Sequence, residues 1–113
     1  NCGLDLVGEV LYGKWKIRLL WFINEDNKRP SELQRKIPDA SRRVLNMQLK
    51  ELEEHELVYK IIYPQVPPKA EYFLTDFGKT LIPVITALGQ WGDNHEERLR
   101  NLVLKRTEKD TEE

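Results

Sequence analysis

The sequence predicts an α+β fold that is mostly helical and contains a single two-stranded β-hairpin. Apolar residues recur at helical spacing over most of the chain, whereas between Leu57 and Leu74 the pattern becomes the alternation expected of strands. The segment 64–68, Pro-Gln-Val-Pro-Pro, divides this region, because its three prolines cannot donate hydrogen bonds to a central strand. With 113 residues, 40% hydrophobic and 33% charged, the chain is expected to form one domain over residues 1–113.

Two helices are predicted in the first part of the chain. Apolar residues at helical spacing between 4 and 11 predict a short helix that ends near Gly13. From Lys14 to about Asn24 most positions are apolar, which predicts a second helix that is largely buried. The turn-forming residues 25–27, Glu-Asp-Asn, are expected to end it.

Two further helices are predicted to follow one another closely. Ser31 begins a capping-box pattern, in which its hydroxyl accepts from a backbone N–H while Gln34 reaches back to the cap. This helix must end before Pro38, because the residue that precedes a proline is disfavoured in the helical region. Ser41 is expected to cap the next helix, which runs to about Glu56.

The helix that follows Ser41 has two stripes of different character. Its predicted buried stripe consists of Val44, Leu45, Leu49 and Leu52. Arg43, Asn46 and Lys50 form a separate polar stripe, which Arg42 flanks. Two helices joined by a short turn, the second presenting long polar side chains, are typical of a helix-turn-helix motif. The hairpin directly after this motif predicts a wing, and thus a winged helix-turn-helix fold.

Charge is distributed unevenly along the chain. The formal net charge is only −1, yet residues 28–50 carry seven basic residues against two acidic ones, which gives this segment +5. A phosphate backbone responds to the local field rather than to the charge of the whole chain. The basic segment coincides with the helix pair and predicts that double-stranded DNA binds there.

The helix after Ser41 is predicted to read bases in the major groove, which is wide enough to admit a helix. Arg42 and Arg43 are suited to guanine, and Asn46 or Gln48 to adenine. Phosphate contacts are expected at the two helix starts, and minor-groove contacts at the wing. The full predicted DNA-binding set is Ser31, Arg35, Ser41, Arg42, Arg43, Asn46, Met47, Lys50, Gln65 and Lys69.

A long final helix is predicted from Thr75, which is suited to cap it, with Pro83 kinking it or limiting its first segment. Its apolar stripe extends beyond a complete small core, and a second copy of the chain is the simplest partner. We therefore expect dimerisation helices at 1–13 and 76–105, a DNA-binding core at 14–75 and a disordered tail at 106–113. The residues predicted at the dimer interface are Leu4, Leu81, Ile85, Leu88, Trp91, His95 and Leu99.

Several short motifs recur in a characteristic order. They are Gly13-Lys14-Trp15-Lys16, Ser31-Glu32-Leu33, Leu49-Lys50-Glu51-Leu52-Glu53, Pro67-Pro68-Lys69-Ala70-Glu71-Tyr72, Leu81-Ile82-Pro83 and Trp91-Gly92. In order and spacing they resemble the HxlR family of bacterial, MarR-like winged helix-turn-helix transcription regulators. The resemblance implies a homodimer that binds a palindromic operator and is assembled through the first and last helices. Departures at Pro30, Asp39-Ala40 and His55-Glu56 lie at turns and element ends, and leave the predicted fold unchanged.

Cys2 is the only cysteine of the sequence, which excludes an internal disulfide and a cysteine-based zinc site. Its spacing to Gly13 is similar to that of a cysteine which senses quinones, aldehydes or oxidants in many members of the family. The resemblance implies a sensing thiol, with Lys14 or Lys16 of a second copy supplying the positive field that lowers its pKa. The alternative is a small residue at the dimer interface.

The sequence displays no constellation for catalysis or for a cofactor. It contains no glycine-rich phosphate loop and no nucleophile elbow, and His55 and His95 have no partner visible in the sequence. We therefore predict a protein that is not an enzyme and needs no cofactor or metal. No apolar stretch approaches the roughly 20 residues that span a bilayer, and the first residues do not resemble a signal peptide.

The expected function is that of a cytoplasmic, nucleoid-associated regulator, with an electrophile, oxidant or small ligand as its effector. The alternative is a winged-helix protein-interaction module without specific DNA binding, since fold alone does not distinguish the two. A thiol-based redox sensor whose output is not DNA is a third possibility, and it rests on Cys2 alone.

Overall fold

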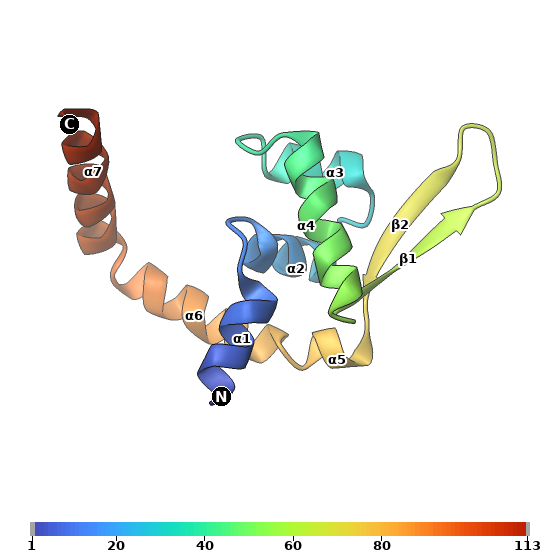
Figure 1. Cartoon of the computed structure of the whole chain (residues 1–113), viewed down its shortest axis with the longest axis horizontal. Helices are drawn as coiled ribbons and strands as arrows, with labels where there is room; N and C mark the ends of the chain where they lie inside the picture. Colours follow the sequence, from blue (N-terminus) through green and yellow to red (C-terminus); the bar gives the residue numbers. More distant parts are fainter. Residues whose placement is uncertain (1, 113) are drawn as a thin grey trace. The chain divides into compact units, whose positions relative to one another are not determined.

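The computed structural model describes residues 2–112, with the backbone alone described for 107–112. Figure 1 shows the order of the elements along the chain. They are α1 (Gly3–Leu11), α2 (Lys16–Asn24), α3 (Pro30–Lys36), α4 (Arg42–Glu54), β1 (Val58–Tyr63), β2 (Lys69–Leu74), α5 (Asp76–Lys79), α6 (Ile82–Asn94) and α7 (Glu96–Glu112). The chain divides into two compact units, which we call the head (Asn1–Ile82) and the arm (Pro83–Glu113).

The core of the head lies among α2, α3, α4 and the root of the hairpin. Each of these elements supplies the apolar side of its own pattern, so that burial repeats at three or four residues in helices and at two in β2. The buried residues include Leu19, Leu20, Ile23, Leu33, Ile37, Leu45, Leu49, Leu52, Leu57, Val58, Tyr72 and Leu74. The predicted buried stripe of α4 is confirmed at its three leucines, whereas Val44 is half-buried.

The start of α3 differs from the predicted capping box at Ser31. The N-cap is Arg29, two residues earlier, so that the helix begins at Pro30, and the Glu32 carboxylate accepts a 2.9 Å hydrogen bond from the backbone N–H of Arg29. The prediction was wrong because proline has a fixed φ and no N–H, and so favours the first helical position. Gln34 does not reach back; its Nε2 donates to the carbonyls of Ile37 (3.3 Å) and Ala40 (2.6 Å), within the turn that leads to α4.

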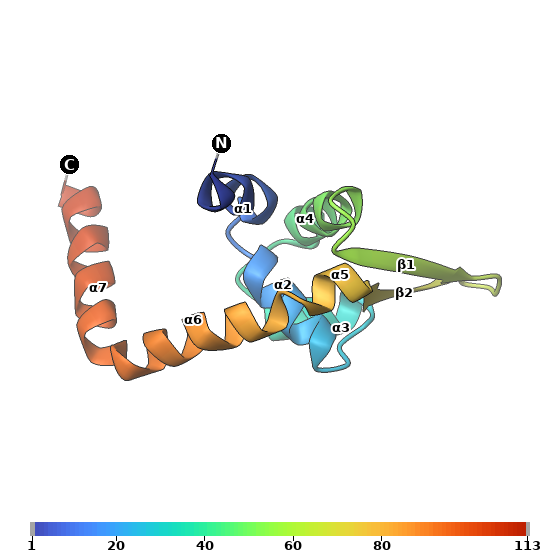
Figure 2. The ribbon, with the colours of Figure 1, turned by 90° about the horizontal axis from the view of Figure 1, so that it is seen from below.

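The predicted cap of α4 is confirmed, since the backbone N–H of Val44 donates to Ser41 Oγ at 3.1 Å. The predicted hairpin is confirmed as well. β1 and β2 pair antiparallel from Val58↔Leu74 to Tyr63↔Lys69. Figures 1 and 2 show the hairpin projecting from the helices of the head.

The hairpin is joined to the helix pair at its root. The backbone N–H of Tyr72 donates to the Lys28 carbonyl at 2.8 Å, which links β2 to the segment between α2 and α3. On one face of the hairpin the rings of Tyr59 and Phe73 stack with centroids 5.3 Å apart. Lys28 Nζ lies 4.9 Å from the centroid of Phe73. The wing and the helix pair therefore share one packed root.

The long final helix predicted from Thr75 is interrupted near Pro83, where the sequence predicted a kink or the end of a first segment, and the structure contains three helices in its place. Thr75 does act as a cap, because its Oγ1 accepts a 2.8 Å hydrogen bond from the N–H of Gly78, but α5 ends at Lys79. Pro83 then lies in the first turn of α6, where its missing N–H removes no helical hydrogen bond. A second interruption follows at His95, after which α7 begins.

α7 continues to Glu112, through most of the segment 106–113 for which the sequence predicted a disordered tail. Glu, Lys and Arg dominate this segment and are good helix formers, which favours a helical backbone. Residue 113 lies outside the described residues. Over the part of the chain that the structure describes, no helix combines the length and the apolar character needed to cross a membrane.

Candidate nucleic-acid interface

One face of α4 gathers the side chains that the sequence assigned to base reading. At about 100° per residue, its exposed positions cover an arc of roughly 140°, whereas the leucines lie on the other side. The exposed side chains on this arc are those of Arg42, Arg43, Asn46, Met47 and Lys50 and, at the last residue of the helix, Glu54. Among the described residues, none of the three cations forms an ion pair. We call the set of Arg42, Arg43, Asn46, Met47 and Lys50 the α4 face.

Gln48, which the sequence offered as a second reader of adenine, does not belong to the α4 face. Its Oε1 accepts a 3.0 Å hydrogen bond from the backbone N–H of Trp15, and the side chain is half-buried. The helical period places Gln48 beside the leucine stripe, and its amide is used inside the head. This part of the sequence interpretation is wrong.

The residues predicted to contact phosphates lie in different surroundings. Arg35 is exposed on the last turn of α3, and Ser41 is exposed at the start of α4. Ser31 is half-buried and does not cap its helix. A capping hydroxyl such as that of Ser41 has a second lone pair and a proton to offer, so capping leaves it able to bind a phosphate oxygen.

On the wing, Gln65 is exposed at the tip and Lys69 lies at the start of β2. Lys69 Nζ is 3.8 Å from Glu71 Oε2 and 5.1 Å from the centroid of the Tyr63 ring. A hydrogen bond to Glu71 raises the pKa of Tyr63 above its ordinary value, with smaller contributions from desolvation and from the charges of Glu71 and Tyr59. Glu71 thus partly offsets the charge of Lys69, the wing residue that the sequence predicted to contact DNA.

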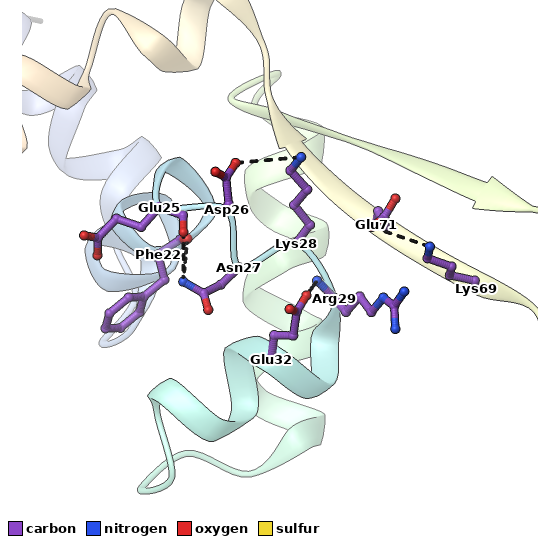
Figure 3. Close-up of polar contacts among 9 residues, drawn as sticks. All are labelled: Phe22, Glu25, Asp26, Asn27, Lys28, Arg29, Glu32, Lys69 and Glu71. Atoms are coloured by element: carbon purple, nitrogen blue, oxygen red, sulfur yellow. Dashed lines mark hydrogen bonds and ion pairs between the residues drawn. The ribbon is translucent and has the colours of Figure 1, made fainter.

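Sequence reasoning missed Arg29, an exposed cation at the start of α3. Figure 3 shows its side chain extending toward the side on which Lys69 lies, while its own backbone N–H is held by Glu32. The neighbouring Lys28 is occupied, because its Nζ lies 3.7 Å from Asp26 Oδ1. Both residues belong to the basic segment 28–50, but the predicted cap at Ser31 left them outside the start of the helix.

Cys2 lies at the start of α1 and is exposed. Lys16, one of the two lysines predicted to act on its thiol, is not available to do so. Its side chain is 1% exposed and its Nζ lies 3.6 Å from Glu51 Oε2. Lys14 is exposed and has its Nζ 4.9 Å from the centroid of the Trp15 ring.

The residues predicted at a dimer interface fall into three groups by exposure. Leu4, Leu88, Trp91 and His95 are exposed, and the exposure of the first three is 83%, 51% and 57%. Leu81 and Leu99 are half-buried. Ile85 is only 5% exposed and is already buried within the chain, so it is removed from the predicted interface.

The two histidines have local roles in the structure. The backbone N–H of His55 ends α4 by donating to the Glu51 carbonyl at 3.0 Å. His95 Nδ1 lies 2.8 Å from the Trp91 carbonyl, and the two rings are 4.9 Å apart. Within the described residues, no group of three or more His, Cys, Asp or Glu side chains is arranged to hold a metal ion.

Comparison with known proteins gives consistent matches over most of the chain. The model of a family described as HxlR-like helix-turn-helix matches residues 10–100. The HTH-type transcriptional regulator YdeP of Bacillus subtilis is 38% identical over 97% of this chain and 86% of its own length. The redox regulator HypR in its reduced form superposes with a TM-score of 0.83 at 37% identity, covering 88% of this chain and 99% of that one. The reduced form of the transcriptional regulator YodB from B. subtilis gives a TM-score of 0.70 at 30% identity, covering 82% and 92%.

Proposed function

The chain belongs to the HxlR-like helix-turn-helix family, and from this premise we propose that it is a sequence-specific, DNA-binding transcriptional regulator that acts as a homodimer on a palindromic operator. One observation carries the proposal: the α4 face presents unpaired cations and an amide on a helix capped at Ser41. Except for Glu54 at the end of the helix, the exposed charges on this arc are positive, whereas a surface that served only solubility would mix both signs. As a regulator of this kind it would act on the nucleoid, in the cytoplasm.

In this proposal α4 enters the major groove and the α4 face reads base edges. Arg42 and Arg43 are suited to the two acceptors of guanine, and Asn46 to the donor and acceptor of adenine. Met47 offers an apolar contact for a thymine methyl group, and Lys50 reaches a phosphate or a base acceptor from the next turn. Each such bidentate contact contributes about 1–3 kcal/mol of discrimination between bases.

The remaining contacts position the protein on the backbone rather than read sequence. Arg29, Arg35 and the hydroxyl groups of Ser31 and Ser41 would bind phosphates around the groove. The wing would contribute Gln65 and Lys69 to the minor groove or to its phosphates. These contacts set the salt dependence, since each neutralised phosphate releases counterions.

Dimerisation supplies the symmetry that a palindromic operator requires. Two copies of α4 would lie about one helical turn, roughly 34–36 Å, apart. The exposed apolar side chains of α1 and of the arm support a second copy as the partner, because large exposed apolar side chains are typical of interaction sites. The proposed interface consists of Leu4, Leu81, Leu88, Trp91, His95 and Leu99.

We propose Cys2 as the residue that responds to an oxidant or electrophile. Support comes from its exposure and from the similarity to HypR, which is described as a redox regulator. Two thiols, those of Cys2 in each copy, would lose two electrons and two protons to an oxidant such as diamide and form one disulfide. With a single cysteine in the sequence, the second thiol must come from the partner copy or from a small thiol.

The proposal is tested by selecting duplexes from a random library with the unmodified protein, followed by fluorescence-anisotropy titration of the selected duplex and a scrambled one. We expect two chains per selected duplex and a log K that falls as salt rises. The variant Arg42→Ala/Arg43→Ala should lose at least about tenfold in affinity for the selected duplex while remaining folded and dimeric.

A matched control is Arg98→Ala/Lys105→Ala, which removes two charges from α7. It should retain the preference for the selected duplex. Failure to enrich any duplex, with no binding to either one at low salt, would instead favour the protein-interaction module. Unchanged affinity of the Arg42→Ala/Arg43→Ala variant would refute base reading by the α4 face.

A further inference from the structure

The most unusual polar residue of the head is Lys16, the first residue of α2. Its side chain is 1% exposed, and its ammonium lies 3.6 Å from the carboxylate of Glu51 on α4. Lysine is almost never fully buried unless it is paired, because an unpaired charge in the interior is very unfavourable. The Glu51 side chain is 42% exposed, so the pair extends from the core to the surface of the head.

A second polar contact joins the same two segments. The backbone N–H of Trp15, next to Lys16, donates to Gln48 Oε1 at 3.0 Å. Gln48 and Glu51 are three residues apart on α4 and therefore lie on one side of the helix. This side is distinct from the α4 face, which lies on the solvent side of the same helix.

Gly13 provides the space that this arrangement needs. Its φ of 158° is one that residues with a side chain rarely adopt. A Cβ added there would lie 3.0–3.1 Å from three side-chain carbons of Lys16. The backbone of Gly13 thus lies against the aliphatic part of Lys16, which passes over it to reach Glu51. The corner of residues 13–16 is built around this one side chain.

We propose that Lys16 and Glu51 are positioning residues for DNA binding, which set the orientation of α4 on the head without touching DNA. This inference rests on the proposed function. The three buried leucines of α4 hold the helix against the core, but apolar contacts are non-directional and tolerate small rotations. The Lys16–Glu51 pair and the Trp15–Gln48 hydrogen bond are directional and fix which side of α4 faces outward.

Residues 13–16 also connect α1 to α4. α1 ends at Leu11, and the chain passes directly from there into residues 13–16. Within the head, a displacement of α1 therefore acts on α4 through the two polar contacts. Lys16 and Glu51 thus determine how closely α4 follows α1.

The expected signature is a loss of discrimination rather than of general DNA affinity. Base contacts need the side chains of α4 in the right geometry, whereas attraction to phosphates is tolerant of small rotations. Removing the pair should therefore lower affinity for the selected duplex and leave affinity for a scrambled duplex nearly unchanged. The slope of log K against log salt should not change either, because Lys16 contacts no phosphate.

The test measures both duplexes with Lys16→Met, Glu51→Gln and the double variant. In each single variant, affinity for the selected duplex should fall at least about tenfold, whereas affinity for the scrambled duplex should fall less than about twofold. Glu51→Gln should have the larger effect, since it leaves the buried ammonium unpaired. The double variant should lose no more than Glu51→Gln alone. Glu25→Gln is the matched control, because it makes the same charge change at an exposed carboxylate at the end of α2, without a Lys16 contact and outside the α4 face.

Two measurements keep the inference falsifiable if a variant is destabilised. Glu51→Asp keeps the charge and shortens the reach by one methylene, so it should lose part of the discrimination with the fold intact. Hydrogen exchange of Lys16→Met should show faster exchange in residues 13–16 and 42–54, and unchanged exchange in the hairpin.

Equal losses on both duplexes, or additive effects in the double variant, would overturn the inference. If no duplex is enriched at all, the proposed function fails first. The exchange experiment then decides separately: unchanged exchange in 42–54 would mean that the pair does not position α4.

Discussion

The head and the arm bury their apolar side chains very differently. In the head, Leu19, Leu33 and Leu49 are completely inaccessible to solvent. Among the described residues of the arm, Ile85 alone is buried. The apolar side chains that the arm exposes are those of Val84, Leu88, Trp91, Leu102, Val103 and Leu104. The head therefore contains its own core, whereas the arm exposes most of its large apolar side chains, which we propose a second copy covers.

α1 resembles the arm more than the rest of the head. It has no buried residue, and Leu4, Leu6 and Val7 are exposed on it. Its sequence is nevertheless amphipathic, which is typical of a helix that packs on something. Burial in the single chain therefore separates residues that maintain the fold from residues that are available for association.

The largest expected effect is that of Leu49→Ala in the head. Truncating this fully buried leucine leaves a cavity, and the free energy of unfolding should fall by about 2–5 kcal/mol. Urea unfolding followed by circular dichroism measures it. The same change at Leu88, which is 51% exposed, should have a small effect on a dilute sample and a larger one at high protein concentration. Equal effects at both sites would remove the distinction between head and arm.

Trp91→Ala should act on association rather than on the fold. The side chain is 57% exposed in the single chain, and large aromatic residues dominate binding energy at protein interfaces. We expect dimer affinity to fall by about 2 kcal/mol, or roughly 30-fold, as measured by sedimentation equilibrium. The far-ultraviolet spectrum should remain that of the parent. A variant that sediments like the parent at every concentration would contradict the proposed interface.

Thr75→Ala tests a smaller contribution, at the junction where the wing ends and α5 begins. The hydroxyl accepts from the Gly78 N–H at 2.8 Å and donates to the Glu56 carbonyl at 2.7 Å. Loss of both should lower the free energy of unfolding by about 1 kcal/mol. Thr75→Ser, which retains the hydroxyl, should lie close to the parent in the same thermal denaturation experiment. If the two variants are equally destabilised, the cap is not the cause.

Cys2→Ser should have the smallest effect on the unperturbed protein. The thiol is exposed and has no packing role, so stability and DNA affinity in reducing buffer should be unchanged. After treatment with diamide, the parent should change its affinity for the selected duplex and the variant should not. Anisotropy titration before and after treatment measures both, and a variant that responds like its parent would refute sensing at Cys2.

Periodicity made the elements of the head predictable from the sequence. The leucine stripe of α4, the Ser41 cap and the alternating hairpin are local patterns, and the structure contains all three. The polar stripe of α4 was equally readable, because exposure follows from the helical period once the buried side is known.

Contacts between segments that are distant in the sequence could not be predicted from periodicity. Periodicity places Gln48 on a side of α4, but it does not show that the backbone of Trp15 lies within hydrogen-bond reach. Lys16 looked like an ordinary surface lysine, because the carboxylate that compensates its burial lies 35 positions further along the chain, at Glu51. An interruption near Pro83 was predicted, whereas the break at His95 was missed because the heptad spacing of apolar residues persists across it although the helix does not.

The hydrogen bond between Tyr72 and Lys28 makes the wing a cantilever. The strand pair is fixed to the α2–α3 segment at that bond, and beyond it the hairpin extends as a beam held at one end. At about 3.3 Å per residue, Gln65 at the tip is roughly 15 Å from the fixed point. A rotation of about 10° at the root would then displace the tip by roughly 2–3 Å, which is enough to make or break a hydrogen bond. The stiffness of this root, to which the Tyr72–Lys28 bond and the buried residues Leu57, Val58 and Leu74 contribute, therefore governs how far the wing can follow a groove of variable width.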